Sequence, residues 1–298
     1  MIRPSSFRRN SETATNNYFQ NEILNLNNDS ILKKATLEFD KLVLKIKGCG
    51  IKVFVFQDDL TYDTPDSIYP NNWITFHTNK RIALYPMFAK NRRHERNEKV
   101  LEFLEKNKIY INDLFDYSSA EKKEMFLEGT GSMVFDRINK KAYCSLSERT
   151  NEDLIFEFCN DFEYMPIIFN AFQDHEKIRK PIYHTNVMMC LAENYSIICL
   201  DAIDKKEERE MVIKSLKDDN KEIITISENQ LNFFTGNMIE LKNGDESFLC
   251  MSTKAYSSLD NNQLKKLRSY SKLIHSSVDT IEKCGGGSVR CMITEIFN

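Results

Sequence analysis

The sequence predicts an α/β protein in which five similar units close into a ring. Five segments each show an apolar strand, a polar turn and a second apolar strand, opened by a polar residue. They begin at Asn72, Ser132, Asn186, Asn237 and Ser288, at intervals of 60, 54, 51 and 51 residues. A repeat of this length is typical of modular architectures in which each unit packs on its neighbours.

Helix-like stretches lie between these hairpins, at roughly 94–107, 150–163, 205–219 and 257–276. Each unit is therefore expected to run strand, turn, strand, helix, strand. The unit that starts at Ser288 is cut short, and the N-terminal segment 31–57 can supply its missing helix and strand. We expect the two ends of the chain to seal the ring, which leaves few exposed sheet edges.

Length and composition indicate an ordinary globular protein. The 298 residues show no linker, so we expect a single domain, 1–298. The net charge of −3 gives no electrostatic argument for nucleic acid or for an anionic membrane as a partner. No transmembrane or signal segment is apparent, which predicts a cytoplasmic protein. The eight cysteines form no CxxC pair and no cluster with histidine, so we expect no metal site. The covalent cysteine chemistry argued below needs no organic cofactor either.

The repeat also suggests where a reactive site lies, because the residues that open each first strand converge near the axis of such a ring. Cys291 follows three glycines, and a reactive cysteine needs a base and electrostatic help. His184 lies two residues before Asn186, and Glu128 precedes the turn at Ser132. The other four histidines are expected at the surface or in packing. For Ser132 and Asn237 a plain role at a strand edge stays open.

Four motifs make a resemblance specific: "EGTGS", "YHTN", "GNM" and "GGGSVRCM". They resemble the guanidino-group-modifying superfamily, which includes arginine deiminase, dimethylarginine dimethylaminohydrolase and glycine amidinotransferase. The nearest resemblance is to the family labelled citrulline-utilisation hydrolase, and it runs through nearly the whole chain. It implies a five-bladed α/β propeller, the pentein fold. It also implies Cys291 as nucleophile, His184 as general acid and base, and Glu128 as the acid that orients the substrate.

Further residues carry over from the same resemblance. "DTPDSIYPNNW" resembles the substrate loop of dimethylarginine dimethylaminohydrolase, where Asp66 matches an acidic residue that contacts substrate. "SLSERTNED" implies that Arg149 binds the substrate carboxylate. "NRRHER" resembles a second arginine site, for which Arg93 is the choice and Arg92 the alternative. Arginine suits this role because its planar fork matches a carboxylate.

The departures from the deiminase pattern predict the substrate. Where deiminases place acidic residues against the guanidinium, this chain has Asn71 and Asn72 at one site and Asn186 at the other. A guanidinium has only donors, whereas a neutral ureido group has a carbonyl acceptor and N–H donors, which an asparagine amide can match. We therefore expect citrulline, converted through a covalent Cys291 intermediate to ornithine, carbon dioxide and ammonia.

Other functions stay open at this point. An arginine dihydrolase comes second, followed by an arginine deiminase or dimethylarginine hydrolase, and an amidinotransferase uses the same thiol intermediate. A similar propeller also serves purely for binding in a ribosome anti-association factor, so the fold alone does not establish catalysis. The expected partner is a small amino-acid substrate, and a homodimer is also considered.

Overall fold

The computed structural model describes residues 1–297 and contains four three-stranded sheets of one design. In each sheet the first two strands pair antiparallel as a hairpin and the third adds parallel to the second. The strands are β3 (Ile74–His77), β4 (Arg81–Leu84) and β5 (Asp113–Asp116); β6 (Met133–Asp136), β7 (Lys141–Ser145) and β8 (Met165–Phe169); β11 (Met189–Leu191), β12 (Tyr195–Ile198) and β13 (Glu222–Thr225); and β14 (Ile239–Asn243), β15 (Glu246–Ser252) and β16 (Lys272–Ser276).

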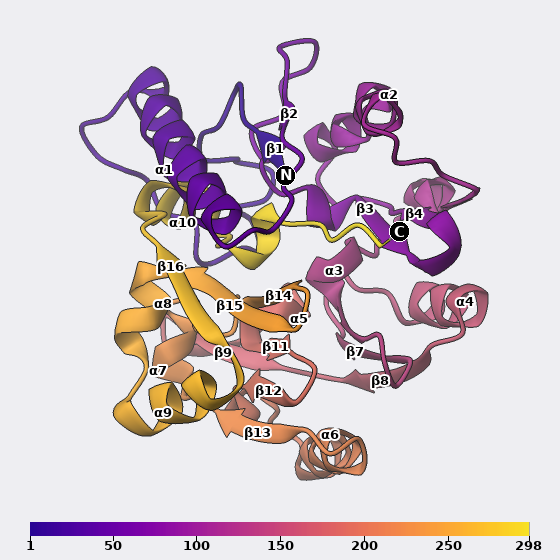
Figure 1. Cartoon of the computed structure of the whole chain (residues 1–298), viewed down its shortest axis with the longest axis vertical. Helices are drawn as coiled ribbons and strands as arrows, with labels where there is room; N and C mark the ends of the chain where they lie inside the picture. The colour runs from indigo at the N-terminus through magenta and orange to yellow at the C-terminus, as the bar shows by residue number, and fades with distance from the viewer. Residues whose placement is uncertain (298) are drawn as a thin grey trace.

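A crossover with a helix joins the second strand of each unit to the third. These helices are α2 (Glu98–Lys106), α4 (Glu152–Phe162), α6 (Lys206–Asp218) and α9 (Asn261–Tyr270). The predicted order of strand, turn, strand, helix and strand is therefore confirmed in four units. Figure 1 shows these units following one another around the molecule, with α1 (Asn28–Gly48) between the last and the first.

Helix α4 illustrates how the sequence forms these crossovers. Asn151 begins it, since its side chain accepts a hydrogen bond from the N–H of Leu154. Phe158 and Phe162 lie one turn apart on the buried face and stack with ring centroids 4.7 Å apart. Glu163 then ends the helix in the left-handed conformation.

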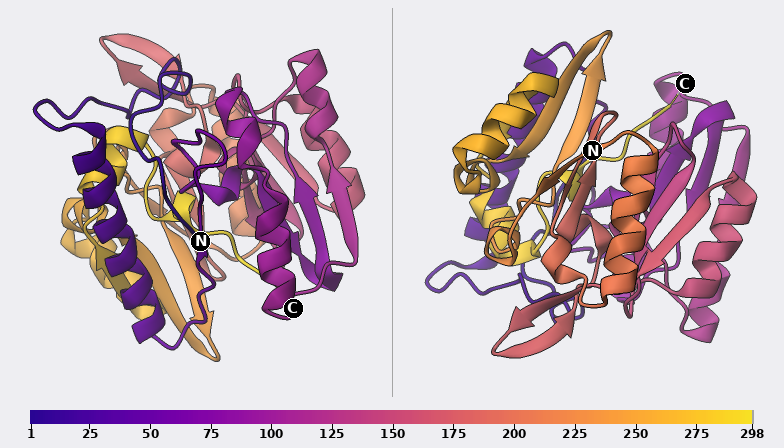
Figure 2. Two further views of the ribbon diagram at one scale, coloured as in Figure 1. Left: turned by 90° about the horizontal axis from the view of Figure 1, so that it is seen from above. Right: turned by 90° about the horizontal axis from the view of Figure 1, so that it is seen from below.

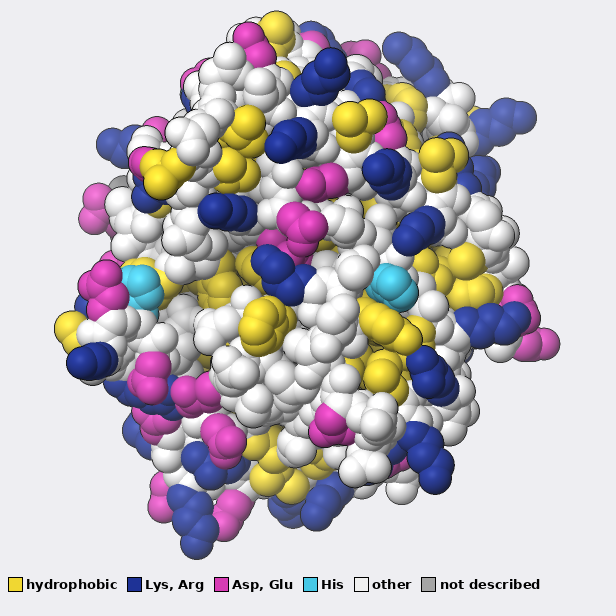
Figure 3. Space-filling model, turned by 90° about the vertical axis from the view of Figure 1, so that its left-hand side faces the viewer, with side chains coloured by type: hydrophobic (Ala, Val, Ile, Leu, Met, Phe, Trp, Pro, Cys, Tyr) yellow, Lys and Arg dark blue, Asp and Glu magenta, His cyan; other side chains and the backbone are white. Residues whose placement is uncertain are grey.

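The remaining elements are short, apart from α1. They are α3 (Gly129–Ser132), α5 (Thr185–Met188), α7 (Glu228–Leu231), α8 (Thr253–Ser258) and α10 (Asp279–Gly285), and the hairpin of β9 (Phe172–His175) and β10 (Ile178–Pro181). Helix α1 packs on α10 and β16, and both views of Figure 2 show it beside the strands β14–β16. On the face in Figure 3, side chains of both charges are interspersed, as is typical of a solvated surface.

The fifth unit differs from the prediction. Its sheet consists of β1 (Ile2–Arg3) paired parallel with β2 (Phe56–Gln57). The strand predicted from Ser288 is wrong, because the chain forms a 3-10 helix, η6 (Arg290–Met292), and then runs to Phe297 without strand pairing. The described sheets remain separate, so no single sheet closes on itself within residues 1–297.

The predicted helix at 257–276 is also only partly right. In the structure this stretch contains the end of α8, helix α9 and strand β16. His275 therefore lies on a strand and not on a helix. Ser271 ends α9 in an extended conformation, so the apolar residues Leu273 and Ile274 join the sheet. Among the described helices none combines the length and apolarity needed to span a membrane.

Candidate active site

The short helical turns that open the units lie against one another. Helix α3 contacts both α5 and the 3-10 helix η1 (Pro70–Asn72), and η1 contacts η6. Glu128 and His184 each occupy the residue just before one of these turns, α3 and α5, and Cys291 lies within η6. The repeat thus brings together three side chains that are far apart in the sequence.

Glu128 and His184 form a buried hydrogen-bonded pair. His184 Nε2 lies 2.8 Å from Glu128 Oε2, and the second carboxylate oxygen accepts from the N–H of Phe88 at 3.0 Å. Burial alone would raise the pKa of Glu128, but Arg149, His184 and Arg92 outweigh it and hold that pKa below its usual range. Burial lowers the pKa of His184 to about 4, although Glu128 opposes the shift. At neutral pH the resting pair is a carboxylate and a neutral imidazole.

Cys291 is buried and surrounded by hydrogen-bond donors. Its Sγ lies 3.2 Å from Nδ2 of Asn237 and 3.7 Å from Nδ2 of Asn186. The backbone N–H of Cys291 donates to the carbonyl of Ser288 at 3.1 Å. Burial raises the pKa of Cys291, and the two asparagine donors together with Arg290 oppose it only in part. The resting group is a thiol, with the amides of Asn237 and Asn186 placed to stabilise the thiolate once it forms.

Two buried arginines bring positive charge to Glu128. Arg149 Nη1 lies 3.4 Å from its carboxylate, and Arg92 Nη1 lies 3.9 Å from it. Arg92 also binds Glu95 through two nitrogens, at 2.8 and 2.9 Å. Burial raises the pKa of Glu95 to about 7 against the opposing effect of Arg92. The guanidinium groups therefore balance much of the negative charge in this cluster.

Arg93 lies outside the cluster. Its Nε donates to the carbonyl of Met87 at 3.1 Å and lies 3.4 Å from Glu121. The 3-10 helix Asn91–Glu95 turns neighbouring side chains in different directions, so Arg92 points inward and is only 2% exposed. This burial favours the alternative, Arg92, over Arg93 as the residue of the site.

Three predicted residues present buried polar atoms that have no hydrogen-bond partner among the described residues. Asn72 Oδ1 accepts from Arg92 at 2.9 Å, but its Nδ2 is unpartnered. Asn71 donates to Thr130 at 3.2 Å, but its Oδ1 is unpartnered, as is Oδ1 of Asp66. Such atoms are rare in folded proteins and indicate a place where a ligand or water binds.

The N-terminal segment 5–20 covers two of the predicted substrate-binding residues. Asn16 Oδ1 and the carbonyl of Thr13 each accept a hydrogen bond from Arg149, in both cases at 2.9 Å. Asn10 and Thr13 donate to Oδ2 of Asp66 at 2.8 and 3.0 Å. The segment therefore occupies the hydrogen-bonding groups that a bound amino acid would need.

Some residues of the site were missed or ranked too low. Asn237 opens the fourth unit at the position that Asn186 holds in the third, and this equivalence could have identified it. No pattern in the sequence marks Glu95 as a residue of the site, since a glutamate three residues after Arg92 looks like any charged residue of a polar stretch. Only the packing shows that both are buried together.

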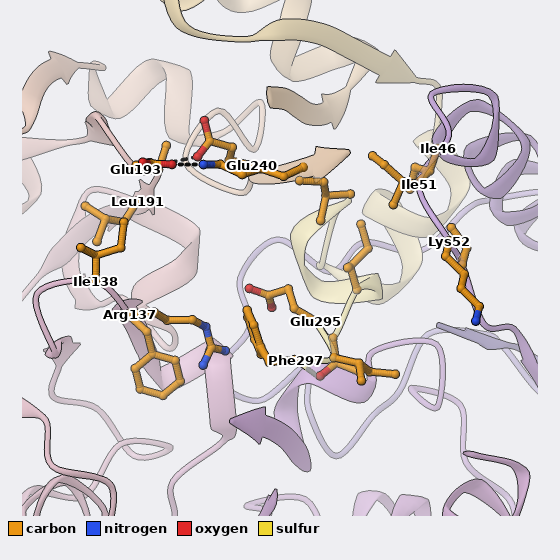
Figure 4. A pocket seen from close by; sticks show the side chains of 18 of the residues that line it. Ile46, Ile51, Lys52, Arg137, Ile138, Leu191, Glu193, Glu240, Glu295 and Phe297 are labelled. Atoms are coloured by element: carbon orange, nitrogen blue, oxygen red, sulfur yellow. Dashed lines mark hydrogen bonds and ion pairs between the residues drawn. The ribbon is translucent and has the colours of Figure 1, made fainter. Parts of the chain in front are cut away.

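A separate cavity of about 600 Å³ lies away from this cluster. Its walls come from the far ends of the unit hairpins and from residues 293–297, and Glu128, His184 and Cys291 do not line it. Figure 4 shows Arg137 beside Phe297 there, with the guanidinium 4.2 Å from the ring centroid. Residues 1–297 contain no group of three or more histidine, cysteine or acidic side chains arranged to hold a metal ion.

Comparison with solved structures shows the fold. The N-terminal domain of ArgZ bound to substrate, from an arginine dihydrolase of the ornithine-ammonia cycle in Cyanobacteria, matches with a TM-score of 0.71 and 17% identity over 99% of this chain and 97% of that one. AgrE in complex with L-arginine matches at 0.72 and 14% identity, over 100% of this chain and 40% of that one. A dimethylarginine dimethylaminohydrolase adduct with S-methyl-L-thiocitrulline matches at 0.60 and 15%, over 88% of each chain.

The extent of these matches differs. Against full-length ArgZ the chain covers only 38% of that protein. No curated protein sequence matches the chain significantly. The family model described as N,N dimethylarginine dimethylhydrolase, eukaryotic, matches residues 3–298, which is nearly the whole sequence. The chain therefore belongs to this family.

Proposed function

We propose that this protein hydrolyses a ureido amino acid, with citrulline as the preferred substrate and Cys291 as the nucleophile. The observation that carries the proposal is the pair of unpartnered amide atoms, Nδ2 of Asn72 and Oδ1 of Asn71, next to the Glu128 and His184 pair. One is a donor and the other an acceptor, which matches a neutral ureido group. A guanidinium would leave the Asn72 donor without a partner.

The mechanism follows from the resting protonation states. When substrate binds, the Cys291 thiol passes its proton to the neutral His184, and the thiolate attacks the ureido carbon. Glu128 and the amides of Asn72 and Asn186 hold the tetrahedral intermediate. The bond from carbon to the δ-nitrogen breaks while protonated His184 gives its proton to that nitrogen, releasing ornithine. Water activated by His184 then hydrolyses the S-carbamoyl group, and the carbamate breaks down to ammonia and carbon dioxide.

The remaining polar groups bind the backbone of the amino acid. Arg149 receives the substrate carboxylate in place of Asn16, and Asp66 receives the α-ammonium group in place of Asn10 and Thr13. Arg92 holds the side chains of these neighbours in position: it donates a hydrogen bond to Asn72 and forms an ion pair with Glu128. Binding therefore requires segment 5–20 to give up some of its hydrogen bonds.

One contact favours a second candidate, an arginine dihydrolase. Asn72 Oδ1 already accepts a hydrogen bond from the guanidinium of Arg92 at 2.9 Å. The unpartnered Oδ1 of Asn71 would accept in the same way from a substrate guanidinium. The structures of ArgZ and AgrE are described as arginine dihydrolase and as a complex with L-arginine, respectively, which adds support for this candidate.

A product assay separates these candidates. The purified protein and its Cys291→Ala variant are incubated with citrulline, arginine or dimethylarginine, and ornithine, citrulline and ammonia are quantified by mass spectrometry and a coupled assay. We expect ornithine from citrulline alone, and none with Cys291→Ala. Ornithine from both citrulline and arginine would establish the dihydrolase instead. Citrulline accumulating from arginine or dimethylarginine would overturn the ureido assignment, and no product from any of the three would count against catalysis and favour a binding module.

We also propose how the units are arranged in the fold. We take the four sheets and the fifth unit as blades of a five-bladed propeller in a single domain, 1–298, whose last residue lies outside the described part. The succession of units in Figure 1 and the likeness to ArgZ support this assignment. The homodimer and the cytoplasmic location stay predictions.

A further inference from the structure

The motif "GNM", in which Asn237 opens the fourth unit, has no role in the mechanism above. Asn237 is buried, and its Nδ2 carries two N–H donors. Two acceptors lie within reach of them: the backbone carbonyl of Asn186 at 3.0 Å and Sγ of Cys291 at 3.2 Å. Each donor has one acceptor, so this amide of the fourth unit bridges the third unit and the nucleophile.

The orientation of the Asn237 amide follows from its neighbours. The backbone carbonyl of Asn186 can only accept a hydrogen bond, so Nδ2 and not Oδ1 has to face it. The second N–H of the same group then serves the sulfur of Cys291. Oδ1 of Asn237 lies 3.6 Å from that sulfur and can accept from the resting thiol. Asn237 can thus partner the sulfur both before and after the thiol loses its proton.

Gly236 explains how Asn237 comes so close to the third unit. A Cβ at Gly236 would lie 2.3 Å from the backbone oxygen of Val187 and 2.8 Å from the carbonyl carbon of Met188, both in α5. A side chain at this position would therefore push the fourth unit away from α5. The motif combines a close backbone approach with an amide that depends on it.

Asn186 lies farther from the sulfur than Asn237 does. Nδ2 of Asn186 donates to the carbonyl of Thr130 at 3.0 Å and lies 3.7 Å from Sγ of Cys291. The corresponding distance from Asn237 is 3.2 Å. Asn237 is therefore the nearer amide donor, and Asn186 is left for the substrate.

We propose that Asn237 is a further catalytic residue, whose amide stabilises the Cys291 thiolate and holds the sulfur against the turn α5. His184 lies just before this turn and Asn186 lies within it. The hydrogen bond to the carbonyl of Asn186 fixes the turn, and the hydrogen bond to the sulfur fixes the nucleophile relative to it. A buried thiolate needs such a donor because burial disfavours its charge. This inference rests on the proposed function only in taking Cys291 as the nucleophile.

Alkylation of Cys291 tests the proposal without any assumption about the substrate. Asn237→Ala removes both donors, whereas Asn237→Asp keeps the shape of the side chain and places a carboxylate beside the sulfur. Thr235→Val is the matched control, because it removes another buried hydrogen bond of the same segment, the one between Thr235 and Ser258 at 2.6 Å. Each protein is treated with iodoacetamide from pH 6 to 11, and modification of the peptide that contains Cys291 is followed by mass spectrometry. Circular dichroism verifies that each variant is folded.

We expect the pH midpoint of alkylation to rise by about one unit in Asn237→Ala, which is about tenfold less thiolate at neutral pH. The midpoint should rise further in Asn237→Asp, since a carboxylate repels the thiolate. Thr235→Val should keep the original midpoint. The midpoint is compared and not the rate, because a smaller side chain also admits the reagent more easily.

Unchanged midpoints in both Asn237 variants would overturn the proposal, as would an equal shift in Thr235→Val. If one Asn237 variant does not fold, the other decides by the same criterion. A shifted midpoint in a protein that turns over no ureido compound would support the role of Asn237 and refute the proposed substrate. An unchanged midpoint in a protein that converts citrulline to ornithine would refute this inference alone.

Discussion

The proposed catalytic groups, Cys291 and His184, are uncharged at rest, whereas Glu128 is ionised. Burial raises the pKa of Cys291 and lowers that of His184 to about 4, so neither group is charged at neutral pH. A resting ion pair of thiolate and imidazolium, as in some cysteine hydrolases, is not what this site contains. The proton of Cys291 has to leave after substrate enters.

This state predicts the pH dependence of the reaction. The value of kcat/KM should rise with pH above neutrality, because the raised pKa of Cys291 leaves only a small fraction of thiolate at pH 7. His184 is already neutral there and adds no further ionisation until the pH falls toward about 4. Initial rates at low substrate concentration from pH 5 to 10 measure this profile. A profile that falls between pH 7 and 9 would contradict the assignment.

The adjacent arginines provide a matched pair of substitutions. Arg92→Lys removes the bidentate hydrogen bonds to Glu95 and the hydrogen bond to Asn72. It leaves buried polar groups without a partner. We expect kcat/KM to fall by about 100-fold or more, because a lysine ammonium cannot match the carboxylate of Glu95 bidentately and also bind Asn72, so the neighbouring groups shift. Arg93→Lys should stay within about threefold of the original rate, since Arg93 faces Glu121 and is partly exposed.

Steady-state kinetics and thermal unfolding of both variants test this prediction. A larger loss of kcat/KM in Arg93→Lys than in Arg92→Lys would restore the original choice of Arg93. Equal losses would show that the whole 3-10 helix matters and neither side chain in particular.

At the scale of elements, the repeat was the strongest signal in the sequence. Alternating apolar residues and polar turns predicted five hairpins, of which four form, and their regular spacing placed Asn186 and Cys291 near one another. The fifth unit failed because apolar residues after Cys291 are typical of a strand, whereas Ile293 and Phe297 instead line a cavity. An irregular segment that lines a cavity needs apolar residues as much as a strand does. The spacing of the apolar residues alone therefore does not distinguish a strand from such a segment.

The site was predicted less completely than the fold. Residues at equivalent repeat positions were found because the spacing pointed to them, but the choice between Arg92 and Arg93 depends on the direction of neighbouring side chains in a 3-10 turn. That direction follows from packing against Glu95 and Tyr69. The individual contacts of segment 5–20 do not follow from its sequence, since its polar residues have no pattern that distinguishes a cover from a loose terminus.

The close approach of helices α3 and α5 gives a prediction at this scale. A Cβ at Gly131 would lie 2.5 Å from Nδ2 of Asn72 and 2.7 Å from the ring of His184. Gly131→Ala should therefore displace both side chains and lower kcat by about 100-fold while the protein stays folded. Gly48→Ala is the control, because nothing lies within 4 Å of its Cβ. Steady-state kinetics measure kcat of both variants, and circular dichroism shows whether they are folded. Normal turnover by Gly131→Ala would mean that the His184 ring has room to move.

For the whole molecule, the buried His184 makes stability depend on pH. Its pKa is about 4 in the folded protein and 6.5 when unperturbed, so the unfolded chain binds more protons between these values. Stability is therefore lost as pH falls from 6.5 toward 4. Glu95 acts in the opposite direction, because its pKa is raised to about 7 and the folded state takes up its proton first.

His184→Gln isolates the first effect. Between pH 6.5 and 4.5 the Tm of this variant should fall less than that of the unaltered protein, since glutamine does not titrate. The titration of Glu95 affects the Tm of both proteins alike. Differential scanning calorimetry at several pH values measures the difference. Parallel Tm curves for the two proteins would show that His184 keeps an ordinary pKa in the fold.

The separation of the catalytic residues along the chain also determines when the site forms during folding. The hydrogen bond from His184 to Glu128 joins residues 56 apart, that from Asn186 to Cys291 joins residues 105 apart, and that from Asn17 to Gly286 joins residues 269 apart. Contacts of such long range form late, because closing large loops costs chain entropy before any contact compensates for it. Secondary structure of each unit can appear early from local contacts, but no unit alone carries a working site. During refolding, the recovery of turnover should therefore lag behind the recovery of far-ultraviolet circular dichroism.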